Sequence, residues 1–394
     1  MNIRRFVIDA ILEPLLSLER LKSYVLFWGH LVFRLRKPFV IGVTGTVGKS
    51  TTTAMIAAVL SDPRAEPFVG LVGNTVENMN DDIGVAATLL RFSETYTLPW
   101  AYWRRPVVLF AIPLRTLFAL FSRYPKVVVL EFGLGPTASF ERMMRIAPPS
   151  IGIVTTIGAA HLSIAKSVDG IIHEKGRLVR AVPPSGLVIL GDGHEYVGAL
   201  EAIARARVSK VSGRGIELSR KITSVVCDRL GIPEDIVASA LREFRSLDGR
   251  LNLLDLGNLV VIDDSYNATV LSMRLGLDTL AVTAKPGQRR VAILGFMAAL
   301  DEESLRFHNE IGALARNRAD LVIGVGELAK HYEPDRWFVD STECVKALDR
   351  VVQAGDCVFV KGSFAARMAH VVEGLRQFSE RQRAQVHSAS TTAT

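Results

Sequence analysis

The 394-residue sequence has few cysteines, and its three, Cys227, Cys344 and Cys357, do not show the spacing of a metal or redox motif. We therefore expect no disulfide framework, which suits the reducing cytoplasm. No stretch reaches the roughly 18 uninterrupted apolar residues that a membrane-spanning helix needs, and no secretory cleavage site follows the first apolar segment. Basic residues are scattered rather than interleaved with aromatics, so nucleic acid is not an expected partner. The net charge of +7 suits anionic substrates or an acidic membrane surface.

Two regions are rich in apolar side chains. Residues 1–36 place an apolar stripe at helical spacing, interrupted at Pro14 and flanked by Arg and Lys. Residues 96–125 combine aromatic, basic and aliphatic side chains. Two interpretations stay open: these segments contact a membrane surface, or they pack on the protein itself or on a second subunit. We expect an amphipathic helical segment over residues 1–38 and a hydrophobic insert over residues 96–125.

The most informative motif is a glycine-rich turn between an apolar run at residues 40–43 and a second apolar run at residues 55–60. Glycines let backbone N–H groups approach phosphate oxygens, and a helix N-terminus adds partial positive charge. A lysine reaches the β- and γ-phosphates, and the hydroxyl that follows it ligates Mg²⁺. Val43 stands where the strict motif has its first glycine. The motif predicts a triphosphate site formed by Gly45, Thr46, Gly48, Lys49, Ser50 and Thr51.

Apolar runs alternate with helical patterns from residue 40 onward, which is typical of α/β folds. The first series of expected strands covers residues 127–131, 151–156 and 186–190, and the second covers 259–263, 290–294, 321–324 and 357–361. We predict a central P-loop ATPase domain with a mainly parallel sheet over residues 39–245. A Rossmann-like α/β domain follows over residues 246–378. Residues 379–394 are small and polar, and we expect a disordered tail there.

Three further side chains are chemical candidates. Glu131 ends an apolar run and precedes Gly133 and Gly135, where a carboxylate beside a nucleotide loop would be a second Mg²⁺ ligand. A strand-end acid that faces solvent is the alternative. His161 follows another expected strand, but a lone histidine is usually structural. Lys175 lies in a helical pattern, where an exposed lysine is the ordinary interpretation.

Taken together, the order and spacing of these residues resemble the Mur ligase family, whose members join a carboxylate to an amine at the expense of ATP during cell-wall synthesis. Beside the phosphate loop, the resemblance rests on residues 78–90, 130–133, 155–162, 174–178, 248–250, 261–268, 292–295 and 360–363. It spans roughly residues 40–375. The block Asp263-Asp-Ser-Tyr-Asn-Ala268 is most similar to the MurF type, which adds D-Ala-D-Ala to UDP-N-acetylmuramoyl-tripeptide.

The resemblance implies a role for each candidate. Lys49, His161 and Lys175 would form the catalytic set. Ser50 and Glu131 would hold one Mg²⁺, and His161 would hold a second together with a carbamylated Lys175. The remaining residues divide by ligand, with Arg250, Asp264 and Asn267 implied at ATP and Asn80, Lys361, Ser363 and Arg367 implied at the substrates.

The implied function is an ATP-dependent carboxylate–amine ligase that forms an acyl phosphate and acts on small-molecule or peptide substrates in the cytoplasm or at the inner face of the membrane. Several positions depart from the family: no UDP-sugar domain precedes the loop, Thr156 replaces an asparagine, and Gly215-Ile216 replaces the His-Asn pair near adenine. Two alternatives stay open. One is a membrane-associated relative for another acid, such as a poly-γ-glutamate-type synthase, and the other is a non-catalytic nucleotide-binding scaffold.

Overall fold

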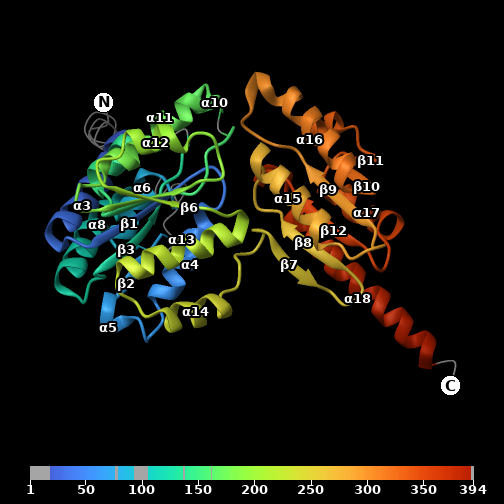
Figure 1. The fold of residues 1–394 in the computed structure, drawn as a ribbon, viewed down its shortest axis with the longest axis horizontal. Coiled ribbons are helices and arrows are strands. Elements are labelled where there is room, and N and C mark those ends of the chain that lie inside the picture. Colours follow the sequence, from blue (N-terminus) through green and yellow to red (C-terminus); the bar gives the residue numbers. More distant parts are fainter. Residues whose placement is uncertain (1–17, 76–78, 93–104, 136–137, 161, 392–394) are drawn as a thin grey trace, which may run out of the picture. The chain divides into compact units, whose positions relative to one another are not determined.

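The computed structural model describes residues 18–75, 79–92, 105–135, 138–160 and 162–391 (Figure 1). The chain divides into two compact units. The first unit comprises Met1–Ile157 and Asp169–Phe244, and the second comprises Gly158–Val168 and Arg245–Thr394. Each unit is an α/β layer structure around one six-stranded sheet, which confirms the expected fold class.

The sheet of the first unit is parallel throughout its described strands, in the order β2-β3-β1-β4-β5-β6. Valine and isoleucine dominate the central strands because both faces of a parallel sheet are covered by helices, and all five residues of β3 are buried. The strands are β1 (Phe39–Thr44), β2 (Val72–Asn74), β3 (Val127–Glu131), β4 (Ile151–Val154), β5 (Leu187–Gly191) and β6 (Arg207–Val211).

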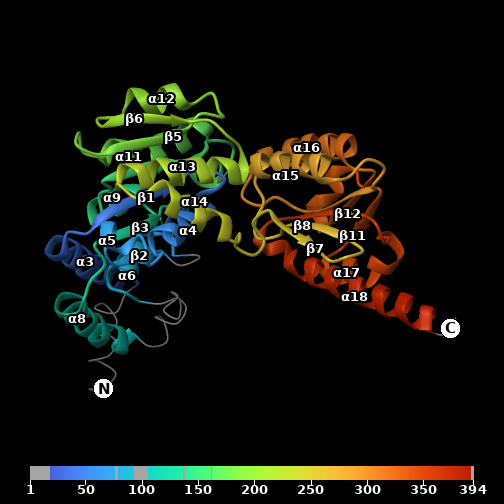
Figure 2. The ribbon, with the colours of Figure 1, turned by 60° about the horizontal axis from the view of Figure 1, so that its bottom comes forward.

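Helices cover both faces of this sheet (Figure 2). One face packs against α4 (Lys49–Leu60), α13 (Gly215–Arg229) and α14 (Glu234–Glu243), which share one core with the strands. The other helices of this unit are α3 (Leu18–Arg36), α5 (Glu66–Val69), α6 (Asp82–Leu89), α8 (Arg105–Phe121), α9 (Phe140–Ile146), α11 (Val168–Ala181) and α12 (Val197–Ala202).

Helix α3 packs on its own unit, against α6, α8 and α9. Leu21, Val25 and Val32 of α3 are buried in a cluster with residues of α6 and α8. The ammonium of Lys22 lies 3.2 Å from the carboxylate of the fully buried Asp82. For residues 18–36 the packing alternative therefore holds for one face of the helix. The expectations for residues 1–17 and 96–104 fall outside the described residues.

No described helix is long and apolar enough to cross a membrane.

The second unit has the strand order β11-β10-β9-β12-β8-β7, in which β7 alone among the described strands runs antiparallel to its neighbour. A tight hairpin joins β7 to β8, so the chain enters this sheet along its edge and turns back directly into the strand that ends in Asp264. The strands are β7 (Asn252–Asp255), β8 (Val260–Asp264), β9 (Arg290–Gly295), β10 (Leu321–Val325), β11 (Arg336–Phe338) and β12 (Cys357–Lys361).

Two helices cover each face of the second sheet. They are α15 (Val270–Thr283) and α16 (Ser304–Arg318) on one face, and α17 (Ser341–Val351) and α18 (Ala369–Thr391) on the other. Short elements complete the unit: α10 (Leu162–Ala165), η2 (Asp301–Glu303), η3 (Glu327–Tyr332) and η4 (Phe364–Ala366).

The expected disordered tail from residue 379 is wrong for most of its length, because α18 continues to Thr391. Ser379 is fully buried, and its hydroxyl donates a hydrogen bond of 2.9 Å to the carbonyl of Leu256. The same helix face buries Val371, Leu375 and Phe378 in the core. Glutamate, glutamine and arginine are good helix formers, so the polar stretch after residue 379 continues a helix that the core has already anchored.

Candidate active site

The glycine turn after β1 has the conformation that a phosphate-binding loop needs. Gly45 and Gly48 have positive φ angles of 147° and 86°, which L-residues rarely adopt. A Cβ atom on Gly45 would lie 2.0 Å from the hydroxyl of Thr155. Glycine is therefore required at residue 45 for both its dihedral angle and its space. Gly48 caps α4, so the helix starts at Lys49.

Thr155 and Thr156, which follow β4, brace this loop from the neighbouring strand. The hydroxyl of Thr156 accepts a hydrogen bond of 2.9 Å from the Val47 amide, and its carbonyl accepts one of 2.8 Å from the Thr46 amide. The hydroxyl of Thr155 donates to the carbonyl of Val47 at 2.6 Å. The loop is thus held in one shape by side chains that lie more than a hundred residues away in the sequence.

The first turn of α4 offers its amides to an anion, because the first N–H groups of a helix have no intrahelical acceptor. Lys49, Ser50 and Thr51 form this turn, and Ser50 is buried. The hydroxyl of Thr52 donates a hydrogen bond of 2.9 Å to Ser219 of α13, which fixes the helix against its neighbour. The turn is therefore positioned to receive phosphate oxygens at the carboxyl edge of the sheet.

Glu131 lies at the same edge, because β3 pairs with β1 in the register that sets Glu131 beside Val43. Its side chain is buried, and one carboxylate oxygen accepts a hydrogen bond of 3.0 Å from the side-chain amide of Asn80. The carbonyl of Asn80 accepts a further bond of 2.7 Å from the Gly133 amide. Asn80 therefore orients the carboxylate, a contact that the sequence comparison had not indicated.

Lys175 is almost fully buried on α11, with 3% of its surface exposed. Burial lowers its pKa well below the ordinary value of 10.5, the charge of Lys49 lowers it further, and Glu131 opposes the shift. Within the described ranges no carboxylate forms an ion pair with it. The three side chains predicted at the phosphate end of the site thus influence one another electrostatically, and burial favours the neutral form of the lysine.

The third member of the predicted catalytic set, His161, lies outside the described residues. Among the residues that are described, no group of three or more His, Cys, Asp or Glu side chains is arranged to hold a metal ion. Ser50 and Glu131 together offer one hydroxyl and one carboxylate, a donor set that suits Mg²⁺ when phosphate and water oxygens complete the shell.

A second cluster lies at the carboxyl edge of the other sheet, inside the second unit. Strands β8 and β12 pair in parallel so that Asp264 stands beside Lys361. The ammonium of Lys361 contacts the Asp264 carboxylate and donates a hydrogen bond of 2.8 Å to the carbonyl of Asn267. Burial lowers the pKa of Lys361 and raises that of Asp264, and their mutual contact opposes both shifts.

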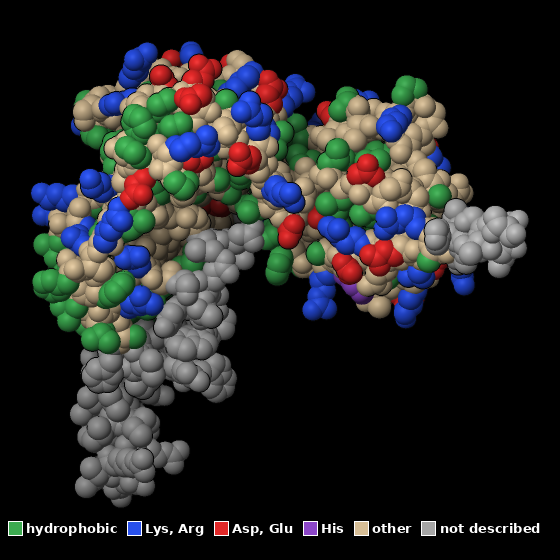
Figure 3. Space-filling model, turned by 90° about the horizontal axis from the view of Figure 1, so that it is seen from below, with side chains coloured by type: hydrophobic (Ala, Val, Ile, Leu, Met, Phe, Trp, Pro, Cys, Tyr) green, Lys and Arg blue, Asp and Glu red, His purple; other side chains and the backbone are tan. Residues whose placement is uncertain are grey.

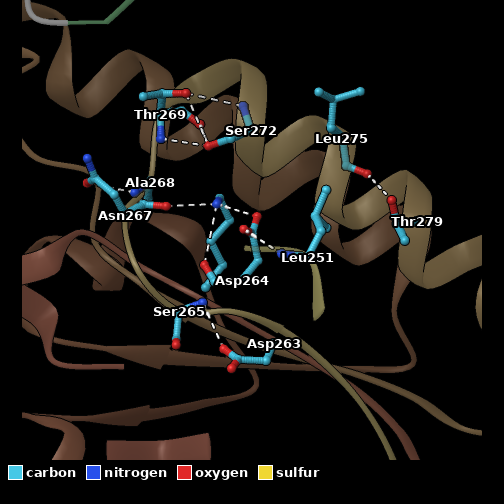
Figure 4. A network of polar contacts seen from close by, with 11 residues as sticks. Leu251, Asp263, Asp264, Ser265, Asn267, Ala268, Thr269, Ser272, Leu275 and Thr279 are labelled. Atoms are coloured by element: carbon cyan, nitrogen blue, oxygen red, sulfur yellow. Dashed lines mark hydrogen bonds and ion pairs between the residues drawn. The ribbon is translucent and has the colours of Figure 1, made fainter. Parts of the chain in front are cut away.

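Backbone amides donate hydrogen bonds to the two aspartates that end β8 (Figure 4). The Leu251 amide donates to Asp264 at 3.1 Å, and the Ser265 amide donates to Asp263 at 3.1 Å. The Gly249 amide donates to the other oxygen of Asp263 at 3.2 Å. Buried carboxylates with several such partners hold their position firmly.

Arg250 and Ser363 carry buried polar atoms that lack a hydrogen-bond partner among the described residues. The guanidinium of Arg250 lies 3.9 Å above the ring of Tyr266, which leaves its ε nitrogen buried without an acceptor. The hydroxyl of Ser363 is likewise buried and unpaired, although its amide is bonded to the carbonyl of Phe296 at 2.9 Å. Orphaned buried polar groups of this kind are expected where a ligand completes them.

Asn267 and Arg367 are placed differently from the buried pair. Asn267 uses its side-chain oxygen to accept a bond of 2.8 Å from the Ala268 amide, just before Thr269 and Ser272 form the capping box that starts α15 (Figure 4). Arg367 is exposed and has a left-handed backbone, with φ of 54°. Its side chain is therefore available at the surface of the second unit.

Comparison with known proteins identifies both units. Residues 43–98 and 110–225 match the Mur ligase middle domain. Residues 249–364 match the glutamate ligase domain of Mur ligases. The chain belongs to the Mur ligase family. The resemblance that the sequence motifs indicated is thereby confirmed.

This Mur ligase has similar relatives among bacterial UDP-N-acetylmuramoyl-tripeptide–D-alanyl-D-alanine ligases. The protein of Mycobacterium tuberculosis is 28% identical over 404 aligned positions, which cover 85% of this chain and 72% of the relative. The Escherichia coli protein is 25% identical over 385 positions, which cover 86% of this chain and 77% of the relative.

Solved structures show the same fold. The MurF ligase from Thermotoga maritima, in complex with ADP, superposes with a TM-score of 0.73 at 19% identity and covers 92% of this chain and 84% of its own. A bifunctional folylpolyglutamate synthase/dihydrofolate synthase superposes with a TM-score of 0.61 at 18% identity, covering 89% and 94%. The fold is therefore shared with ligases of more than one type.

The structure brings the predicted residues of this Mur ligase together in two groups. The first unit contains the predicted phosphate-loop, metal and carbamate residues, namely Gly45, Gly48, Lys49, Ser50, Thr51, Asn80, Glu131 and Lys175. The second unit contains the others, namely Arg250, Asp264, Asn267, Lys361, Ser363 and Arg367. Sequence reasoning missed the bracing by Thr155 and Thr156, although two adjacent threonines at a strand end were a usable signal. It also missed the stacking of Arg250 on Tyr266, for which the sequence offers no local sign.

Proposed function

We propose that this chain is an ATP-dependent carboxylate–amine ligase of cell-wall peptide synthesis, which adds D-Ala-D-Ala or a similar amine to a muramoyl-peptide-like acceptor. The names of its relatives support this substrate class. The preformed phosphate loop beside Glu131 and the buried Lys175 carries the proposal. The three cysteines are buried and unpaired, which suits work in the cytoplasm.

The proposed reaction has two steps. The carboxylate of the acceptor attacks the γ-phosphorus of ATP, the bond to the β-phosphate oxygen breaks, and ADP leaves. Lys49 and the amides of α4 offset the negative charge that the phosphoryl group carries during transfer. The amine of the second substrate then attacks the acyl carbon, phosphate leaves, and the amine loses one proton. The balance is one amide, one ADP and one phosphate per ATP.

A magnesium ion fits the residues at the phosphate loop. Glu131 is a buried carboxylate at the strand end, held by Asn80, and Ser50 supplies a hydroxyl from the first turn of α4. We propose that these two side chains hold the Mg²⁺ that accompanies ATP, which supplies Lewis-acid stabilisation of the phosphates when bound. We keep His161 as a proposed ligand of a second ion.

Carbamylation of Lys175 fits its surroundings in the same way. Burial lowers the pKa of Lys175 and favours its neutral form, and a neutral amine can add to carbon dioxide and release one proton. The product is a carbamate, and this anion attracts the nearby cation of Lys49. We propose that this anion helps to hold the second metal ion together with His161.

The carbamate is tested by ¹³C NMR of the protein in labelled bicarbonate. We expect one carbamate resonance that Lys175→Ala removes, with activity of the variant partly restored by short carboxylic acids. Lys210→Ala, on the surface of the same unit, is the matched control and keeps the resonance. A Lys175→Ala variant with full activity and no lost resonance contradicts the carbamate.

In the second unit we propose that Arg250, Asp264 and Asn267 act at the nucleotide, and that Lys361, Ser363 and Arg367 act at the amine substrate. The unpaired ε nitrogen of Arg250 and the unpaired hydroxyl of Ser363 support a ligand at this edge. Because Lys361 is already neutralised by Asp264, its role is to hold β8 and β12 in register at the ligand rather than to supply free charge.

The function is tested by measuring phosphate release and the mass of the product with ATP, UDP-N-acetylmuramoyl-tripeptide and D-Ala-D-Ala. We expect stoichiometric amide and phosphate, no product without either substrate, and none from Lys49→Ala. Product from poly-γ-glutamate and glutamate instead would assign the chain to the other ligase type. ATP binding without turnover on any acid and amine pair would leave a nucleotide-binding scaffold.

A further inference from the structure

Helix α8 exposes an apolar stripe that nothing in the proposed reaction uses. Leu114, Leu117, Phe118 and Phe121 recur at the spacing of one helix face, and Leu114 and Phe121 are 71% and 85% exposed. The opposite face is also apolar, but there Ile112, Thr116 and Ala119 are buried within the unit. One face of α8 is therefore explained by packing, and the other is not.

Helix α3 extends the same surface. Phe27 and Leu35 are exposed on its outer side, while its inner side packs against α6 and α8. Arg36 donates hydrogen bonds to the carbonyls of Ala119 and Ser122, so the ends of the two helices are fastened together. We call the set Phe27, Leu35, Leu114, Leu117, Phe118 and Phe121 the α3–α8 surface.

The concentration of these residues is unusual for a solvated surface. Of the thirteen exposed large hydrophobic residues in the described part of the chain, six belong to the α3–α8 surface. Figure 3 shows hydrophobic side chains on this end of the first unit, with lysine and arginine side chains close by. Contiguous exposed apolar area of this kind marks an interaction site more often than it marks ordinary surface.

The charges on helices α3 and α8 themselves are mainly positive. Helix α8 contains no acidic residue, and the only one in α3 is Glu19, in its first turn. Arg34 and Lys37 are exposed beside Leu35 in the sequence. The guanidinium groups of Arg91 and Arg115 lie 5.4 Å and 5.7 Å from the centre of the Phe118 ring. The stripe is thus bordered by cations, which favour an anionic partner.

We propose that the α3–α8 surface docks the enzyme on a phospholipid bilayer that contains anionic lipids, with α8 lying in the plane of the interface. The leucine and phenylalanine side chains enter the acyl boundary, and the arginine and lysine side chains reach the headgroup phosphates. A symmetric contact between two copies of the chain is less favourable, because it would set these cations against one another.

The test is co-sedimentation of the full chain with phosphatidylcholine vesicles that do or do not contain phosphatidylglycerol. We expect binding to the anionic vesicles that salt weakens. The double variant Leu114→Ser with Phe121→Ser lowers the partition coefficient about tenfold or more, because it removes two of the side chains that enter the acyl region. Arg34→Gln with Lys37→Gln lowers mainly the salt-dependent part.

The matched control is Val282→Ser with Leu305→Ser, which removes two exposed hydrophobic side chains from the second unit. It binds vesicles as the unaltered chain does. All variants keep the melting temperature and the ATP-dependent phosphate release of the unaltered chain in solution, so a failure of docking is distinguishable from a failure of the ligase.

Three results overturn the proposal. The first is that the unaltered chain ignores anionic vesicles. The second is that the stripe variant and its control bind equally well. The third is a concentration-dependent dimer in analytical ultracentrifugation that the stripe variant abolishes while vesicle binding is absent, which would assign the α3–α8 surface to a second copy of the chain.

Discussion

Each unit buries one lysine, but the two lysines differ in their charged partners. Lys361 in the second unit is paired with Asp264 and bonded to Asn267, so its charge is compensated within the fold. Lys175 in the first unit is equally buried, has Lys49 as its strongest charged neighbour, and has no ion-pair partner in the described part of the chain. The ion pair of Lys361 with Asp264 holds two strands together. The surroundings of Lys175, which lack such a pair among the described residues, favour the binding of an anion.

This contrast gives the surroundings of the two buried lysines different uses. The Lys361 ammonium is already paired with Asp264. A ligand at the second unit is therefore expected to bind mainly to Arg250 and Ser363, whose buried polar atoms lack partners among the described residues. A ligand at the first unit gains electrostatic energy directly, because its phosphate oxygens meet the cation of Lys49 and the amides of α4.

The largest effect is expected from breaking the compensated pair. Lys361→Met leaves the buried Asp264 carboxylate without its partner and should lower the free energy of unfolding of the protein by about 3–5 kcal/mol at neutral pH. The loss becomes smaller in mild acid, because an acid whose pKa is raised in the folded state gains a proton there and the burial cost disappears. Urea denaturation at several pH values measures both quantities.

The control for this change is Lys346→Met, which removes an exposed partner of Glu343 and should leave the free energy of unfolding nearly unchanged. Adding Asp264→Leu to Lys361→Met should recover part of the stability. If Lys361→Met costs as little as Lys346→Met, the pair is not the anchor that we describe.

Next in size is Lys49→Ala, which removes the cation that we propose faces the transferring phosphoryl group. We expect phosphate release to fall about 100- to 1,000-fold, with little change in the free energy of unfolding, because Lys49 is only half-buried. Lys221→Ala, a surface lysine of α13 paired with Glu217, is the control and keeps full turnover. Turnover of Lys49→Ala within about threefold of the unaltered chain would remove this lysine from the mechanism.

Lys175 gives a pH dependence of the opposite sign from that of Asp264. In buffer free of carbon dioxide, unfolded Lys175 binds a proton that the folded chain excludes, so stability rises with pH up to the ordinary pKa of 10.5. The slope approaches about 1.4 kcal/mol per pH unit in that window, and Lys175→Met should lack it. Lys210→Met keeps it, and equal slopes for all three proteins would mean that the lysine is solvated.

The smallest effect is expected at the brace of the phosphate loop. Thr156→Val removes the hydrogen bonds of 2.9 Å and 3.2 Å to Val47 while keeping the volume of the side chain. We expect a loss of about 1 kcal/mol in stability and a KM for ATP about fivefold higher. Thr342→Val, exposed on the second unit, should change neither. An unchanged KM would show that the glycines alone shape the loop.

The local sequence was sufficient to predict the strands and the glycine turn, whose conformations depend mainly on neighbouring residues. Residues 127–131 and 357–361 are strands as expected, because short apolar runs that contain valine belong to parallel sheets with two covered faces. The glycine turn was likewise readable, since its dihedral angles require glycine. Pattern, propensity and turn chemistry agree at these positions, which is why they were predictable.

The remainder depended on strand order and packing, which a single sequence does not display. Lys175 has the pattern of an exposed helical lysine, and only its place on α11 above the sheet buries it. Asn80 stays a predicted substrate residue, and its hydrogen bond to Glu131 depends on the neighbouring strand β3. The contact of Asp264 with Lys361 follows from β8 and β12 being adjacent, although 97 positions separate these residues.

The hairpin of β7 and β8 ties the start of the second unit to its chemistry. The longer segment of this unit begins at Arg245, and soon afterwards the amides of Gly249 and Leu251 donate hydrogen bonds to the carboxylates of Asp263 and Asp264. A ligand that contacts these aspartates is therefore expected to change the hydrogen bonds of backbone amides close to the start of this segment. Nucleotide binding at this edge is therefore expected to change the hydrogen-exchange rates of the Gly249 and Leu251 amides together.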